Sequence, residues 1–158
     1  MGDARRARLS EAELAAWGER IGREAATPLV LALDGDLGAG KSTLARAVAH
    51  GAGVEGDVPS PTFNLLFRYD LPGGRTLFHL DLYRLEQQDD VWELGWQELG
   101  AGDQVVLIEW AENAFGVLPA PRWDVVLEEE GDADCRLVTA TPVDGPPTLP
   151  PFPGEGAA

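Results

Sequence analysis

Lysine is almost absent from this chain: its 158 residues contain a single lysine, Lys41, and every other basic side chain is an arginine. Cysteine is as scarce, and the lone Cys135 excludes an internal disulfide and any metal site built from several cysteines. No apolar run approaches the roughly 20 residues of a membrane-spanning helix, and residues 1–9 lack the apolar core of a signal peptide. These absences predict a cytoplasmic protein that makes no membrane contact.

Positive charge is also in short supply, and the formal net charge is −15. A surface of this sign repels nucleic acid, whose binding depends on lysine and arginine displacing counterions. We therefore expect any role in nucleic-acid chemistry to be indirect, through a partner. The same acidity also keeps a protein soluble, and the two explanations are compatible.

The single lysine lies in residues 35–42, Gly-Asp-Leu-Gly-Ala-Gly-Lys-Ser, which fit the phosphate-binding pattern G-x-x-x-x-G-K-[ST] in full. Glycines in such a loop let successive backbone N–H groups converge on phosphate oxygens. The lysine ammonium reaches the β- and γ-phosphates, and the serine hydroxyl can ligate Mg²⁺. The predicted nucleotide-binding residues are Gly35, Asp36, Leu37, Gly38, Ala39, Gly40, Lys41, Ser42 and Thr43.

The segments around this loop provide the context that the pattern requires. Residues 29–33 form a continuous apolar run, which is typical of a parallel strand buried on both faces. Residues 43–50 predict a helix whose N-terminus adds its partial positive charge to the phosphate site. An ordinary glycine-rich turn would leave the position of the only lysine unexplained.

Periodicity and turn residues divide the rest of the chain into further elements. Ser10 and Glu13 form a capping box that begins a helix over residues 11–25. The other predicted elements are an antiparallel hairpin of strands 63–69 and 76–80, a helix over 89–99, a buried strand at 105–108, and a late hairpin of strands 122–128 and 135–141.

These elements predict an α/β fold, a P-loop NTPase-like three-layer sandwich with a central, mostly parallel sheet and a peripheral antiparallel hairpin. The predicted ATPase domain spans residues 1–141. Residues 142–158 contain six prolines and three glycines and are predicted to form a disordered tail, because so little of this segment can be buried.

Two carboxylates close apolar strands, Asp81 after residues 77–80 and Glu109 after residues 105–108. Carboxylates at the carboxyl ends of strands face the crevice where nucleotides bind in open α/β sheets. We assign Asp81 to Mg²⁺, through water, because Mg²⁺ keeps several of its waters. We assign Glu109 to orienting or deprotonating the attacking water. A solvated charge at a strand end is the simpler explanation for each carboxylate alone.

Three further residues are open to two interpretations. Thr62 follows Pro59-Ser60-Pro61 and could complete the metal shell as a switch-like residue, or could simply start a strand. His79 shares a strand face with Asp81 and is best read as an ordinary packed histidine, while Trp110 could cover the nucleotide or pack in the core. The residues predicted to form the Mg²⁺ site are thus Ser42, Asp81, Thr62 and Glu109, and the predicted catalytic residues are Lys41 and Glu109.

The loop, the Pro-Ser-Pro-Thr segment at 59–62, His-Leu-Asp-Leu-Tyr-Arg at 79–84 and Ile-Glu-Trp at 108–110 occur in this order, and with them the chain resembles the TsaE (YjeE) family over about residues 9–141. The resemblance implies a bacterial ATPase that binds ATP with Mg²⁺, releases ADP and joins the proteins TsaB and TsaD. It implies a supporting role in forming threonylcarbamoyladenosine at position 37 of tRNA, with tRNA reached only through the partners. By motif position it implies the roles given above for Lys41, Ser42, Thr62, Asp81 and Glu109.

Two other functions stay open at this point. A small P-loop kinase acting on a nucleoside or metabolite could begin with the same loop, but such kinases carry an arginine-rich lid, and no basic residue lies between Arg84 and Arg122. A non-catalytic nucleotide-sensing module would bind ATP without hydrolysing it. Glu109 distinguishes that module from an ATPase.

Overall fold

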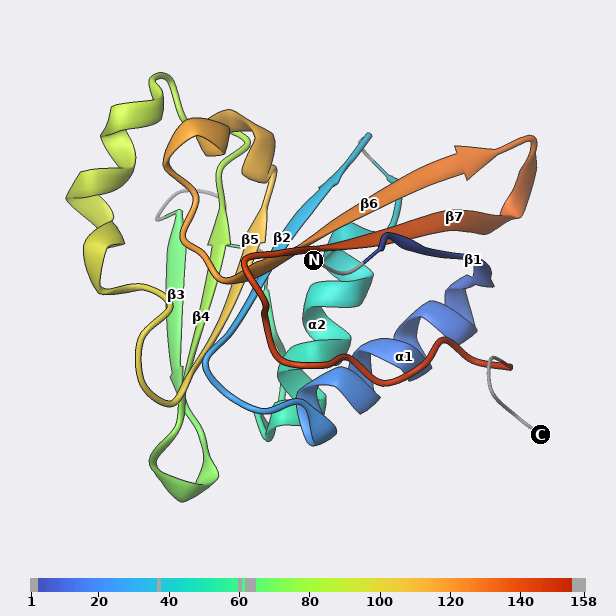
Figure 1. The fold of residues 1–158 in the computed structure, drawn as a ribbon, viewed down its shortest axis with the longest axis horizontal. Coiled ribbons are helices and arrows are strands. Elements are labelled where there is room, and N and C mark those ends of the chain that lie inside the picture. The colour runs from blue at the N-terminus through green and yellow to red at the C-terminus, as the bar shows by residue number, and fades with distance from the viewer. Residues whose placement is uncertain (1–2, 37, 60, 62–64, 155–158) are drawn as a thin grey trace.

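The computed structural model of the protein describes residues 3–36, 38–59, 61 and 65–154. Its centre is one seven-stranded sheet in the order β1-β7-β6-β2-β5-β4-β3. The four middle strands run parallel, while β3, β7 and β1 are antiparallel to their neighbours. The prediction of an α/β fold with a central, mostly parallel sheet and a peripheral antiparallel hairpin is therefore confirmed (Figure 1).

The strands are β1 (Arg5–Ser10), β2 (Leu29–Gly35), β3 (Leu66–Asp70), β4 (Thr76–Asp81), β5 (Gln104–Glu109), β6 (Arg122–Glu130) and β7 (Asp132–Val143). Two α-helices, α1 (Glu11–Glu24) and α2 (Lys41–Ala52), cover one face of the sheet. Four short 3₁₀ helices complete the described part of the chain: η1 (Pro72–Gly74), η2 (Gln88–Leu94), η3 (Trp96–Glu98) and η4 (Ala111–Val117). Among the described residues, no helix is long and apolar enough to cross a membrane.

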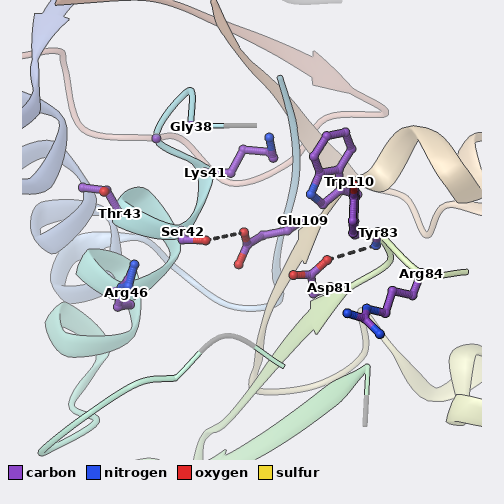
Figure 2. A pocket seen from close by; sticks show the side chains of 11 residues that line it. Gly38, Lys41, Ser42, Thr43, Arg46, Asp81, Tyr83, Arg84, Glu109 and Trp110 are labelled. Carbon is purple, nitrogen blue, oxygen red and sulfur yellow. Dashed lines mark hydrogen bonds between the residues drawn. The ribbon is translucent and has the colours of Figure 1, made fainter. Parts of the chain in front are cut away.

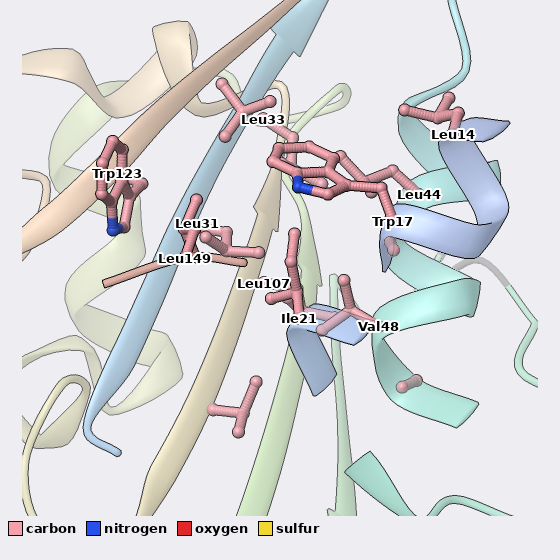
Figure 3. Packing of buried hydrophobic residues seen from close by; sticks show 14 of the residues in the cluster. Leu14, Trp17, Ile21, Leu31, Leu33, Leu44, Val48, Leu107, Trp123 and Leu149 are labelled. Carbon is pink, nitrogen blue, oxygen red and sulfur yellow. The ribbon is translucent and has the colours of Figure 1, made fainter. Parts of the chain in front are cut away.

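The apolar run that becomes β2 contributes to two separate cores. Leu29, Leu31 and Leu33 point into the core beneath α1 and α2, and Val30 and Ala32 point into the core beneath η2, η3 and η4. This alternation is what a strand covered on both faces requires. Figure 3 shows the first core, where Trp17 and Ile21 of α1 and Leu44 and Val48 of α2 meet Leu31 and Leu107 of the sheet.

Glycines allow α1 and α2 to cross closely. A Cβ at Gly22 would lie 2.1 Å from the carbonyl oxygen of Val48, and a Cβ at Gly51 would lie 2.1 Å from the carbonyl oxygen of Glu19. A methyl group at either position would therefore push the helices apart. Because α2 follows directly on the predicted phosphate loop, this crossing also fixes the direction in which the helix N-terminus points.

Several predicted boundaries are wrong. The helix expected over residues 89–99 is two 3₁₀ helices, η2 and η3, separated by Gly95, whose positive φ of 74° interrupts the helical backbone. Strand β1 was not predicted, because its three arginines hide the period-two pattern; it lies at the edge of the sheet, where charged side chains are tolerated. Part of the strand expected over 63–69 lies outside the described residues.

The prediction of a disordered tail from residue 142 onward is wrong for its described part. Strand β7 continues to Val143, and the chain then crosses the helical face of the sheet (Figure 1). Leu149 and Phe152 are buried, and the Trp17 Nε1–H donates to the carbonyl oxygen of Pro150 at 3.1 Å. Composition alone suggested too little to bury, but two apolar side chains are sufficient because α1 and β1 leave a place for them.

We expect Phe152→Ala to lower the free energy of unfolding by about 3 kcal/mol, as for other buried aromatic truncations. Phe152 is only 2% exposed, and its ring centroid lies 4.7 Å from that of Trp17. Urea unfolding followed by tryptophan fluorescence measures the change. Phe115→Ala is the control, because Phe115 is 66% exposed and its removal should cost little. Equal stability of the Phe152→Ala variant and the parent would show that the tail does not pack as described.

Candidate functional site

A cavity of about 500 Å³ opens at the carboxyl ends of the parallel strands, beside the N-terminus of α2 (Figure 2). The residues around it come from the loop before α2, from the end of β4 and from the end of β5. They are Gly38, Gly40, Lys41, Ser42, Thr43, Arg46, Asp81, Tyr83, Arg84, Glu109 and Trp110. The fold thus brings together Lys41, Ser42, Asp81 and Glu109, four of the predicted site residues.

The loop between β2 and α2 has the backbone shape that its glycines predict. Gly40, at the start of α2, has a φ of 110°, and a Cβ there would lie 2.9 Å from Cδ2 of Leu14. Gly38 has a φ of 83°. Only glycine adopts these angles without strain, and the residues that follow Gly40 at the start of α2 line the cavity. Leu37, predicted as part of this loop, lies outside the described residues.

Lys41 is only 4% exposed, and its ammonium group points into the loop. Nζ donates to the carbonyl oxygens of Gly35 and Asp36, the latter at 2.9 Å, and lies 4.0 Å from the ring centroid of Trp110. Burial lowers the pKa of Lys41, while the charges of nearby carboxylates, led by Glu109, act in the opposite direction. The cation is thus surrounded by dipoles and a ring face, with no direct ion pair among the described contacts.

Glu109 is 2% exposed and divides its two oxygens between two partners. Oε1 accepts a hydrogen bond from the Ser42 hydroxyl at 2.8 Å, as Figure 2 shows. Oε2 lies 2.6 Å from Nε2 of His79. The hydroxyl of Ser42 is therefore oriented by Glu109, on the side of the cavity where the Ser42 side chain is exposed to its lining.

Asp81 ends β4 and pairs in register with Glu109 of the parallel strand β5. Its Oδ1 accepts a hydrogen bond from the Tyr83 N–H at 3.0 Å. Burial raises the pKa of Asp81, and the negative charge of Glu109 contributes to the increase. Both carboxylates line the same cavity, so each can serve a divalent cation or a water molecule there.

Three residues of the site were not assigned from sequence, or were assigned only loosely. His79 was expected to be an ordinary packed strand residue, yet it contacts Glu109 directly. Tyr83 was not singled out; its ring lies 4.9 Å from that of Trp110, and both rings form one wall of the cavity. Trp110 has a left-handed backbone with a φ of 56°, and its ring lies over Lys41 while also packing against the core beneath η2, η3 and η4. The only signal for these contacts in the sequence was the alternation of side chains between the two faces of β4 and β5.

Thr62, predicted as a metal-side residue, lies outside the described residues. Within the described ranges, no three histidine, cysteine, aspartate or glutamate side chains gather closely enough to hold a metal by themselves. Ser42, Asp81 and Glu109 nevertheless supply the oxygen atoms that Mg²⁺ prefers, and Mg²⁺ is commonly bound by one or two carboxylates together with phosphate oxygens.

A second cavity, of about 220 Å³, lies on the other side of the loop. It shares Gly38, Gly40 and Thr43 with the first cavity and is completed by Glu11, Leu14, Ala39, Asp134 and Arg136. The Arg136 guanidinium donates from Nε to the carbonyl oxygen of Ala39 at 3.2 Å and from Nη2 to that of Gly38 at 3.3 Å. Strand β7 thereby holds the loop from outside.

We expect Asp81→Asn to raise the thermal stability of the ligand-free protein, since burial raises the pKa of Asp81 and thus disfavours its charged form. A raised folded-state pKa gives stability below the unfolded-state pKa, and this stability is lost as the pH rises through the folded-state pKa. The gain in the free energy of unfolding from removing the charge should therefore appear near pH 7 and vanish near pH 3. Near pH 7 it should be less than about 1 kcal/mol, because solvent screens a half-buried group.

Thermal unfolding at the two pH values measures this difference. Asp57→Asn, at an exposed position, is the matched control and should leave the melting temperature unchanged. An equal gain for Asp81→Asn at both pH values would show that the charge of Asp81 is not its cause.

Comparison with known proteins identifies the family. The family model described as Threonylcarbamoyl adenosine biosynthesis protein TsaE matches residues 9–138. The chain is 41% identical over 114 residues to the Bacillus subtilis tRNA threonylcarbamoyladenosine biosynthesis protein TsaE. The aligned region covers 72% of this chain and 70% of that protein. It is 35% identical over 131 residues to the Treponema pallidum protein of the same name, covering 83% of this chain and 96% of that one.

A solved structure gives the same answer. The crystal structure of Bacillus subtilis YdiB superposes with a TM-score of 0.74 at 33% sequence identity, covering 90% of this chain and 88% of that one. This match confirms the predicted P-loop NTPase-like fold. The resemblance seen in the loop and strand-end motifs is confirmed as well, and the chain belongs to the TsaE family of tRNA threonylcarbamoyladenosine biosynthesis proteins.

Proposed function

We propose that this protein binds and hydrolyses Mg-ATP as the ATPase subunit of the cytoplasmic machinery that forms threonylcarbamoyladenosine at position 37 of tRNA. In this proposal it supports turnover of a transferase made of TsaB and TsaD and does not perform the transfer itself. The observation that carries the ATPase part is the cavity in which Lys41, Ser42, Asp81 and Glu109 converge. The family carries the pathway.

The triphosphate is proposed to enter the larger cavity. Without it, the partners of the Lys41 ammonium among the described residues are two loop carbonyls and the ring of Trp110. Phosphate oxygens are stronger partners for a buried cation than neutral carbonyls, because a charge-assisted hydrogen bond is roughly twice as strong as a neutral one. The N–H groups at the start of α2 and the helix dipole act in the same direction.

Mg²⁺, when bound, would neutralise charge on the β- and γ-phosphates. Ser42 is the direct ligand offered by the loop, because its proton is already committed to Glu109. Asp81 faces the same space and is proposed to act through water. Glu109 is proposed to orient or deprotonate the attacking water, and Thr62 to complete the metal side. Arg84 also lines the cavity, where it can face either the phosphates or a partner.

The nucleoside is proposed to occupy the smaller cavity. The two cavities meet at Gly38, Gly40 and Thr43, so a ligand whose phosphates lie against the loop can pass from one to the other. Arg136 would then fix the loop between the two halves of the nucleotide. We take the base to be adenine, as the family resemblance implies.

Partners are proposed on two grounds. The net charge of −15 makes direct tRNA binding unfavourable, so tRNA would be reached through TsaB and TsaD. A P-loop enzyme that lacks an arginine finger can turn over at only about 10⁻⁴ to 10⁻³ s⁻¹, and a finger supplied by a partner adds roughly 10³–10⁵-fold. Isolated protein is therefore expected to be slow.

The test is a phosphate-release assay with Mg-ATP, run on the isolated protein and again with TsaB and TsaD. We expect slow release alone and faster release in the mixture. Products are also analysed for phosphate transfer to a small acceptor, which would favour a kinase instead. Deleting the gene in the native host should remove the tRNA modification, and its persistence would contradict the pathway assignment.

A further inference from the structure

The buried histidine beside the site is used by none of the roles above. His79 lies on β4, is 0% exposed, and has Nε2 at 2.6 Å from Oε2 of Glu109. Its other ring nitrogen, Nδ1, is buried and is the one buried side-chain polar atom without a hydrogen-bond partner among the described residues. A buried polar atom left unpaired is uncommon and calls for an explanation.

The contact with Glu109 assigns a role to Nε2. A carboxylate oxygen can only accept a hydrogen bond, so Nε2 carries a proton and donates it to Oε2 of Glu109. The ring thus directs a donor at one oxygen of one carboxylate.

That donor and the Ser42 hydroxyl together determine how the Glu109 carboxylate lies. The terminal torsion of a glutamate is broad, so a carboxylate with one partner can rotate freely. Here Ser42 holds Oε1 at 2.8 Å and His79 holds Oε2 at 2.6 Å, which fixes the plane of the group. Loss of either partner would release the carboxylate and, with it, the orientation of the Ser42 hydroxyl.

We propose that His79 is a positioning residue: its Nε2–H fixes the Glu109 carboxylate so that Oε1 stays on the Ser42 hydroxyl and keeps Ser42 ready for Mg²⁺. The inference rests on the proposed binding of Mg-ATP. His79 makes no contact with the nucleotide itself in this scheme. Its effect on the reaction passes entirely through Glu109.

The test compares His79→Leu, which removes the donor at similar bulk, with His79→Gln, whose amide N–H₂ can replace the Nε2 donor. His50→Gln, at the chain's other histidine on an exposed part of α2, is the control. Calorimetry measures ATP affinity with and without Mg²⁺, and single-turnover assays measure hydrolysis. Thermal unfolding establishes that each variant is folded.

For His79→Leu we expect the gain in ATP affinity produced by Mg²⁺ and the rate of hydrolysis each to fall by about 10–100-fold, as is usual for lost outer-shell partners. ATP affinity without Mg²⁺ should stay within about threefold, and His79→Gln should recover most of both losses. A folded His79→Leu variant with parental Mg²⁺ dependence and parental hydrolysis overturns the inference.

A double-mutant cycle with Glu109→Ala, which removes both carboxylate oxygens, separates positioning from general structural damage. If His79 acts through Glu109, His79→Leu should change the Mg²⁺ dependence of ATP binding little in the Glu109→Ala background. An equal loss in both backgrounds would show that His79 acts independently of Glu109, and would overturn the inference. Absence of Mg-ATP binding by the parent protein would instead contradict the proposed function.

Discussion

Glu109→Gln is expected to bind Mg-ATP and to hydrolyse it at least about 100-fold more slowly than the parent, within the usual range for removing a general base. The amide introduced by this substitution would keep one acceptor oxygen, so the contact with Ser42 or with His79 can persist. The negative charge that faces the cavity is removed, which should leave ATP affinity unchanged or somewhat tighter because repulsion of the triphosphate is reduced. Calorimetry gives the affinity and single-turnover phosphate release gives the rate.

The comparison with Glu112→Gln separates chemistry from net charge. Glu112 is exposed, lies three residues later and does not line the larger cavity, so its change removes a charge that also acts on Lys41 but cannot contact a water molecule in the cavity. It should hydrolyse ATP like the parent. If Glu109→Gln also hydrolyses ATP at the parental rate, Glu109 is not the hydrolytic carboxylate, and the nucleotide-sensing alternative gains support once the parent's own rate is shown to be negligible.

The parts of the fold that could be predicted from sequence are those in which one local pattern had one structural solution. The apolar run in β2 and the Ser10–Glu13 capping box were both found, because burial on two faces and helix capping leave direct marks in the residues. Strand β1 and the tail were missed for the opposite reason. Their arginines and prolines are typical of solvent-exposed segments. Only the folded structure shows that β1 pairs with β7 and that the tail accepts a hydrogen bond from Trp17.

The site divides in the same way. Lys41, Ser42, Asp81 and Glu109 were predicted to share a cavity, since a loop between a strand and a helix and the carboxyl ends of parallel strands must meet at one edge of the sheet. The pair of His79 and Glu109 could not be predicted, because it depends on which strands are neighbours and in what register. The order β2-β5-β4 is a property of the whole sheet.

Lys41→Ala is expected to weaken ATP binding by about 2–5 kcal/mol, which is roughly 30-fold to several thousand-fold, because it removes one member of a desolvated charge pair. The ligand-free fold should not suffer. Burial lowers the pKa of Lys41, so its charged form is an electrostatic cost to the empty protein. Thermal unfolding of the Lys41→Ala variant should therefore occur at the parental temperature or higher, while nucleotide stabilises only the parent.

Arg23→Ala is the matched control for that prediction, because it removes one positive charge from an exposed position at the end of α1. Its ATP affinity should equal that of the parent, and the difference between the two variants then measures what the buried ammonium contributes beyond net charge. Since the chain has no second lysine, no neighbouring ammonium can substitute for Lys41. A Lys41→Ala variant that binds Mg-ATP as tightly as the parent would show that the nucleotide is held elsewhere, and would remove the basis for assigning Ser42, Asp81 and Glu109 to it.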